Sequence, residues 1–220
     1  MKFLALSIAA LLALSTHAGA ATAPPCEFSD DLSQVRGVSV VAGEGRAYFG
    51  ATPEAAGACA GKGCAYLLPG DAVVTGETSG EATCAGFQSK SGKTTQGWLP
   101  AARLAPAKPK PSDWAGYWGE KDRSISIRAD SDKLAIDAHL VFQGGGPVFS
   151  GAFKAKATAS GPMLEFAIDD KGRPVDAAKA ERACRVKLAL VGPLLLVHDE
   201  GCVGAGSAVT FEGAYTKAKR

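Results

Sequence analysis

The stretch Cys184-Arg-Val-Lys-Leu-Ala-Leu-Val-Gly-Pro-Leu-Leu-Leu-Val-His198 sets two apolar runs on either side of a Gly-Pro pair. Apolar runs of strand length around such a pair predict a β-hairpin that turns at Gly192-Pro193. When residue 184 is reflected through this turn, its partner falls close to residue 201, within one residue of Cys202. Cys184 and Cys202 are also the only cysteines beyond residue 110, so we expect them to form a disulfide.

Other segments in the second half of the chain, beyond residue 110, also have the composition of strands. The half begins with Asp113-Trp-Ala-Gly-Tyr-Trp118, and apolar residues alternate with others in 124–128 and 133–141. Further strand candidates are residues 148–157, 163–168 and 208–216. About eight antiparallel strands are enough to close a barrel. We therefore expect residues 113–217 to form an antiparallel β-barrel or meander.

In the first half of the chain, Gly or Pro residues separate short runs that have the composition of strands. These runs predict strands at residues 47–49, 65–68, 72–75, 82–87 and 96–99. Such close spacing is typical of a small barrel. Between the halves, Ala105-Pro-Ala-Lys-Pro-Lys-Pro111 has only small or charged residues between its prolines, which favours an extended spacer. The sequence thus predicts an all-β protein with domains at 21–104 and 113–217 and a linker at 105–112.

The first 20 residues have the pattern of a signal peptide. Met1-Lys2 supplies positive charge, residues 3–14 are almost wholly apolar, and Ala18-Gly19-Ala20 offers small side chains at the cleavage positions. The apolar run is shorter than the about 20 residues that span a bilayer. No cysteine follows the predicted cut directly, as it would in a lipoprotein. We expect an exported protein without a membrane anchor, located in the periplasm or secreted.

All six cysteines lie after this cut: Cys26, Cys59, Cys64, Cys84, Cys184 and Cys202. An even number of cysteines in an oxidising compartment indicates disulfides rather than zinc ligands, which need closely spaced Cys and His. Three pairings are open among the four cysteines of the first half. We favour Cys26–Cys59 and Cys64–Cys84, because the last two lie on candidate neighbouring strands.

Charge and motifs argue against several classes of function. Lys and Arg number 24 against 22 Asp and Glu, which leaves no basic surface for nucleic acid. Gly144–Gly146 lacks the Gly-Lys-Ser/Thr of a phosphate loop, and no Gly-x-Ser-x-Gly nucleophile motif is present. His139 and His198 are far apart in the sequence, which disfavours a metal site. We expect no cofactor, no metal and no catalytic activity.

Three motifs in the first half resemble the bacterial SH3-like domain. They are Arg46-Ala-Tyr-Phe with Pro53, Leu67-Leu-Pro-Gly-Asp-Ala-Val-Val74, and Gly92-Lys93 followed by Gly97-Trp98-Leu99-Pro100. The resemblance covers roughly residues 36–106 and implies a small barrel that binds peptidoglycan or an envelope protein. Many members carry a Gly-Trp pair where this chain has Ser79-Gly80-Glu81.

The second half has two shorter resemblances. Gly116-Tyr117-Trp118 resembles the opening Gly-x-Trp of lipocalin-type barrels, which implies a barrel around one small ligand. The ending, from Val197 to Tyr215, is similar to the close of small exported proteobacterial β domains and implies no particular activity.

Aromatic residues are the candidate ligand-binding side chains, because aromatic faces bind sugars and peptides. Trp98, Trp114 and Trp118 lie close to the predicted linker, and Tyr48 and Tyr66 are secondary candidates. The alternative is that these rings pack in the cores of the two domains. An exposed tryptophan would place the site on the surface between them.

Three functions fit these features. The first is a non-catalytic envelope-binding module whose SH3-like domain contacts peptidoglycan or an envelope protein. The second is a periplasmic inhibitor or immunity protein that inserts the glycine-rich loops 144–146 and 201–206 into a cell-wall hydrolase. The third is a small-ligand carrier that uses the interior of the second barrel. We favour the first; no feature of the sequence predicts an oligomeric state.

Overall fold

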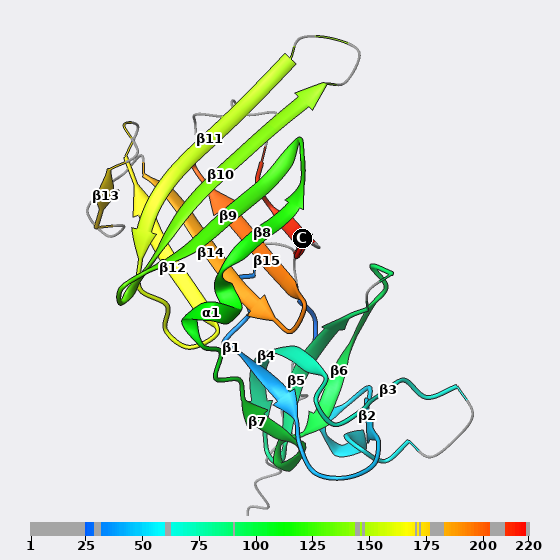
Figure 1. Ribbon diagram of the computed structural model, residues 1–220. Helices are drawn as coiled ribbons and strands as arrows, with labels where there is room; N and C mark the ends of the chain where they lie inside the picture. The colour runs from blue at the N-terminus through cyan, green and yellow to red at the C-terminus, as the bar shows by residue number, and fades with distance from the viewer. Residues whose placement is uncertain are drawn as a thin grey trace, which may run out of the picture.

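The regular structure is almost entirely β, which confirms the all-β class that the sequence predicts (Figure 1). Of the described helices, none is long and apolar enough to cross a membrane. The predicted signal peptide at 1–20 lies outside the described residues, as do residues 144, 145 and 203–206 of the glycine-rich loops. The computed structural model describes residues 25–28, 32–59, 63–89, 91–143, 146, 148–169, 171, 173–176, 183–202 and 210–218.

The N-terminal half contains β1 (Gly37–Val41), β2 (Ala47–Tyr48), β3 (Tyr66–Leu67), β4 (Ala72–Ser79), β5 (Ala82–Gln88), β6 (Thr94–Pro100) and β7 (Leu104–Pro106). Short 3-10 turns lie at Pro53–Ala55 and Ala101–Arg103. Five strands form an antiparallel sheet in the order β6-β5-β4-β1-β7, and β2 pairs with β3. Buried side chains from both sheets, among them Val41, Leu67 and Leu99, share one apolar core.

The predicted spacer at 105–112 is partly built into this sheet. Ala105 and Pro106 lie in β7, where Pro106 is opposite Ser39 of β1. The short helix α1 (Pro111–Trp114) begins at the last proline of the stretch. Because β7 is an edge strand, a proline there removes no hydrogen bond from the interior of the sheet.

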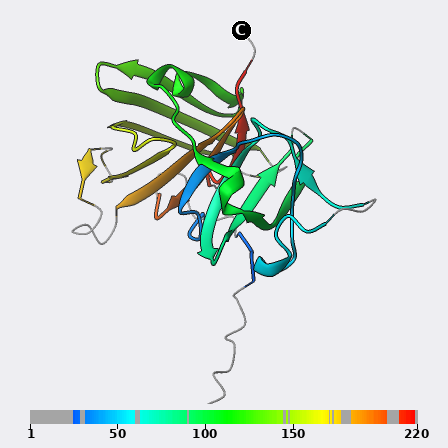
Figure 2. The ribbon, with the colours of Figure 1, turned by 90° about the horizontal axis from the view of Figure 1, so that it is seen from below.

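The C-terminal half consists of two antiparallel sheets that pack face to face (Figure 2). One has the order β11-β10-β9-β8 and the other β13-β12-β14-β15-β16. Side chains of both sheets, such as Ile125 and Leu188, fill the space between them. The strands are β8 (Gly116–Glu120), β9 (Arg123–Asp130), β10 (Lys133–Gln143), β11 (Val148–Ala157), β12 (Met163–Ile168), β13 (Pro174–Val175), β14 (Cys184–Val191), β15 (Leu194–Glu200) and β16 (Gly213–Thr216).

The sequence predicts a barrel or meander of about eight strands, and the described strands do not close into a barrel. On one side the two sheets meet through an isolated bridge between Trp118 and Lys217 and a 2.8 Å hydrogen bond from the Ala218 N–H to the Tyr117 carbonyl. On the other side β11 and β12 follow each other in the chain, but no ladder joins them within the described residues. A barrel needs a continuous ladder around its circumference. The described strands therefore form an open two-layer sandwich.

The β14–β15 hairpin lies inside its sheet and turns at Gly192-Pro193, as predicted. Gly192 has a φ of +58°, a conformation that favours glycine. Leu188 and Leu195 lie in the core of the sandwich and are 0% exposed. Ala189 and Val191 are on the opposite face of β14 and are also buried, because the N-terminal half covers them. Burial on both faces explains the nearly continuous apolar sequence of this hairpin.

A small apolar cluster joins the two halves. Leu32 and Val35 precede β1, Val74 lies on β4, and all three pack with Val191 of β14. The Lys187 ammonium supports this contact by donating hydrogen bonds to the carbonyls of Leu32 at 3.0 Å and Val35 at 3.3 Å. The outer face of the β14–β15 hairpin is thus the surface on which the N-terminal half docks.

All six cysteines form disulfides, which indicates an oxidising, non-cytoplasmic environment. The Cys184–Cys202 bridge is confirmed. Arg185 pairs with Glu200, which places residue 184 opposite residue 201. The pairing favoured for the first half is wrong, because the bridges there are Cys26–Cys84 and Cys59–Cys64.

The path of the N-terminal segment accounts for this difference. The Phe28 N–H donates a 3.2 Å hydrogen bond to Oε1 of Gln96 on β6. Cys26 and Phe28 pack against Cys84 and Trp98, so the segment lies along β5 and β6. Cys59 lies in a loop only 5 residues before Cys64 and bridges locally. The strand pattern on which the prediction was based contains no signal for where this segment runs.

We expect Leu195→Ala to lower the free energy of unfolding by about 2–5 kcal/mol, because it leaves a cavity in a fully buried part of the sandwich core. Urea unfolding of the oxidised protein measures this change. Leu68→Ala is the matched control, since Leu68 is 51% exposed and its truncation should cost less than about 0.5 kcal/mol. Equal losses in the two variants would contradict the placement of Leu195.

Candidate functional site

The three tryptophans predicted as ligand-binding residues belong to the cores. Trp98, Trp114 and Trp118 are each 1% exposed. Trp98 packs with Cys84 in the N-terminal half. In the sandwich, the Trp118 Nε1–H donates a 2.9 Å hydrogen bond to the Trp114 carbonyl, and the Lys217 ammonium lies 5.0 Å from the centre of the Trp118 ring. This burial corrects the expectation that a tryptophan face is available to a ligand.

Tyr48 and Tyr66 form an aromatic group with Arg46 on the N-terminal half. The two rings are cross-strand partners in β2 and β3 and lie edge to face, with 5.8 Å between their centroids. The Arg46 guanidinium lies 4.2 Å from the centre of the Tyr66 ring. A hydrogen bond to the Tyr48 hydroxyl and the neighbouring Tyr66 raise the pKa of Arg46 above its ordinary value. Tyr66 is 42% exposed, so this group is open to a partner.

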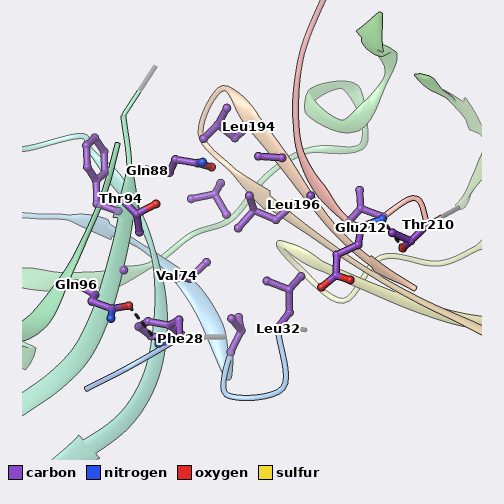
Figure 3. Close-up of a pocket in the computed structure, with 17 residues that line it drawn as sticks. Phe28, Leu32, Val74, Gln88, Thr94, Gln96, Leu194, Leu196, Thr210 and Glu212 are labelled. Carbon is purple, nitrogen blue, oxygen red and sulfur yellow. Dashed lines mark hydrogen bonds between the residues drawn. The ribbon is translucent and has the colours of Figure 1, made fainter. Parts of the chain in front are cut away.

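A larger concave site opens between the two halves of the molecule (Figure 3). We call it the inter-half groove; its volume is about 490 Å³, within the range of about 300–1,000 Å³ typical of ligand pockets. The apolar cluster that joins the halves forms its deep end. One wall follows the N-terminal sheet and the other follows β15 and the chain around the start of β16. The labelled lining residues are Phe28, Leu32, Val74, Gln88, Thr94, Gln96, Leu194, Leu196, Thr210 and Glu212.

The inter-half groove combines an apolar floor with an uncharged polar wall. Leu32, Val74 and Leu196 supply the floor, while Gln88 and Gln96 project from the N-terminal sheet (Figure 3). The Gln96 amide is held in place because its Oε1 accepts the hydrogen bond from the Phe28 N–H. A side-chain amide both donates and accepts hydrogen bonds. This wall therefore matches the peptide groups of an extended chain.

Glu212 supplies the charge on the opposite wall, and it is the only charged residue among the described residues that line the groove. Its carboxylate lies 3.4 Å from Nδ1 of His198. Its N–H donates a 3.0 Å hydrogen bond to the Thr210 hydroxyl, which in turn donates to Asp199. These contacts hold the backbone around Glu212 and place one carboxylate beside the apolar floor.

The sequence predicts a site between the halves only if a tryptophan is exposed, and it does not identify the residues that line the inter-half groove. The available signal is Leu194-Leu195-Leu196, because consecutive residues of a strand face opposite sides of the sheet. Leu195 enters the sandwich core, which leaves Leu194 and Leu196 on the outer face. Gln88, Gln96 and Glu212 carry no such signal, since polar residues on strands usually face water.

Other polar side chains that could bind a ligand or metal lie on the surface, outside the groove. Asp169 accepts hydrogen bonds from the N–H and the guanidinium of Arg173, which lower its pKa. Asp130 accepts a 2.7 Å hydrogen bond from Lys156, which lowers its pKa. His139 is exposed on β10. Within the part of the chain that the structure describes, no group of three or more His, Cys, Asp or Glu could hold a metal ion.

Comparison of the chain with protein-family models, with curated proteins and with solved structures found no match. We therefore infer function from the chemistry of the inter-half groove and of the exposed aromatic group.

We expect tryptophan fluorescence of the folded protein to resist quenching by iodide, because all three indoles are buried. The Stern–Volmer constant should be several-fold lower in the native protein than in concentrated urea. Tyr66→Trp is the matched control, since it places an indole at an exposed position and should restore quenching without unfolding. Strong quenching of the native wild type would contradict the burial of the tryptophans.

Proposed function

We propose that this chain is an exported, non-catalytic binding protein of the cell envelope, built from an SH3-like module and a β-sandwich. We further propose that the inter-half groove holds an extended apolar segment of an envelope protein. The observation that supports this most is the apolar floor, to which both halves contribute and which stays open to solvent beside the cluster that joins them.

The lining of the groove favours a peptide over a glycan. Sugar-binding sites commonly stack the ring on an aromatic face; the tryptophans of this chain are buried, and the aromatic side chains that line the groove are Phe28 and Phe87. Most of the apolar lining is Leu and Val, whose side chains match the apolar side chains of a peptide. The amides of Gln88 and Gln96 are suited to the peptide groups between those side chains.

The carboxylate of Glu212 predicts which charge the bound segment carries. A carboxylate beside an apolar floor attracts a cation strongly, because the local dielectric constant is lower than that of water. We therefore expect the bound segment to carry Lys or Arg close to its apolar residues. An acidic residue at the same place would face Glu212 and weaken binding.

Two alternative functions, a small-ligand carrier and a peptidoglycan-binding protein, have different degrees of structural support. A carrier that uses the interior of the second half has little support, because buried side chains from both sheets fill that space. Binding of peptidoglycan has one supporting feature, the exposed group of Tyr48, Tyr66 and Arg46. None of these three residues lines the inter-half groove. The two proposals therefore involve different residues and can be separated.

We expect labelled extended peptides in which Leu and Val alternate with Thr to bind the full oxidised chain. Fluorescence anisotropy should show that a peptide ending in Lys binds about tenfold more tightly than one ending in Glu, about 1.4 kcal/mol. Glu212→Gln should remove most of this ratio. Leu196→Glu should weaken every peptide, whereas Leu68→Glu, outside the groove, should have no effect.

Sedimentation with purified peptidoglycan sacculi tests whether the ligand is peptidoglycan rather than a peptide. Under the proposal, the wild type does not pellet saturably and the peptides bind as described. Saturable pelleting that is lost in Tyr66→Ala but kept in Leu196→Glu would assign the ligand to the exposed aromatic group instead. Peptide binding that Leu196→Glu leaves unchanged, with the fold intact by circular dichroism, would overturn the groove as the binding site.

A further inference from the structure

The β10–β11 hairpin extends past the rest of its sheet. β10 and β11 are paired over 10 positions, from Leu134 opposite Ala157 to Gln143 opposite Val148. β9 accompanies them only as far as Arg123, which is opposite Leu140. The Val141 N–H donates a last hydrogen bond, 2.7 Å long, to the Asp122 carbonyl. Beyond it the hairpin is a two-stranded ribbon, which we call the arm (residues 142–143 and 148–149). The arm projects from the molecule at the top of Figure 1.

The arm is apolar and exposed. Phe142 is 52% exposed and its cross-strand partner Phe149 is 37% exposed, while Val148 is 58% exposed. Residues 140–153 include no Asp, Glu, Lys or Arg, although 21% of the chain is charged. A two-stranded ribbon is at best marginally stable in water on its own. Aromatic side chains gathered on such a ribbon mark a contact surface.

The outer edge of β11 is also free of a partner strand. β11 is the last strand of its sheet, and no described residue pairs with its outer edge. Proteins commonly protect such an edge with lysines. Here Lys154 and Lys156 lie only in the second half of the strand, where they pair with Asp137 at 3.1 Å and Asp130 at 2.7 Å. The first half of the edge, residues 148–153, has no charge.

We propose that this edge pairs with the same edge of a second copy of the chain, which forms a two-fold dimer through antiparallel β11 strands. Residues opposite each other must lie on the same face of the joint sheet, so their numbers have equal parity. With Gly151 on the axis, Phe149 lies opposite the partner's Phe153 on the core side. Val148 then lies opposite the partner's Lys154 on the outer side.

Charge favours a second copy as the occupant. An uncharged strand is complementary to itself, whereas a strongly acidic or basic partner would gain nothing from it. The register centred on Gly151 keeps Lys154 away from the partner's Lys154, so that no like charges meet. The chain has a formal net charge of only +2, so two copies repel each other little. Two-fold dimers with self-complementary interfaces are the commonest oligomers.

Analytical ultracentrifugation of the full oxidised chain tests this proposal. The wild type should sediment at twice the monomer mass at micromolar concentration. Phe149→Lys adds a charge at the centre of the interface and should raise the dimer dissociation constant at least tenfold. Tyr117→Lys is the matched control, because Tyr117 is 42% exposed on β8 at the far side of the same sheet and should leave the dimer unchanged.

A wild type that is monomeric at all concentrations would overturn the proposal. A dimer that Phe149→Lys does not weaken would place the interface elsewhere and would also overturn it. If the wild type is monomeric but pellets with phosphatidylethanolamine–phosphatidylglycerol vesicles in a manner that depends on Phe149, the arm contacts a lipid surface instead. None of these outcomes depends on the inter-half groove, since no arm residue lines it.

Discussion

Burial of the β14–β15 hairpin on both of its faces is the constraint on which the rest of the structure depends. The inner face closes the sandwich core through Leu188 and Leu195, and the outer face receives the N-terminal half through Ala189 and Val191. Each face therefore belongs to a different apolar core. A polar substitution on either side of this hairpin would leave an uncompensated polar group in an apolar environment.

The inter-half groove is a consequence of the same contact. Within the described residues, the two halves pack together at the cluster around Leu32 and Val191, and the groove opens beside this cluster. Apolar side chains such as Leu196 continue from the cluster into the open part of the groove. The groove is thus an extension of the junction, and a ligand there would contact both halves at once. Such a ligand would stabilise their relative arrangement by mass action.

The strand edges show where the molecule remains open to partners. Within the described residues the sandwich does not close into a barrel, so β11 keeps a free edge there and its arm projects beyond β9. The Cys184–Cys202 and Cys26–Cys84 bridges lie at other places, where they tie chain segments to the sheets. The groove, the arm and the exposed aromatic group are therefore the parts of the described chain that are open to another molecule.

Local pattern was sufficient for most of the strands, though not for β1 or β7. It was also sufficient for the Gly192-Pro193 turn and the Cys184–Cys202 bridge, because these depend on residues that are close in the sequence or related by a single hairpin. The Cys26–Cys84 bridge, the burial of the tryptophans and the residues of the groove depend on which sheet faces pack together. That choice is made by long-range contacts between the halves, and alternation along a strand shows that a face is apolar without showing what will cover it.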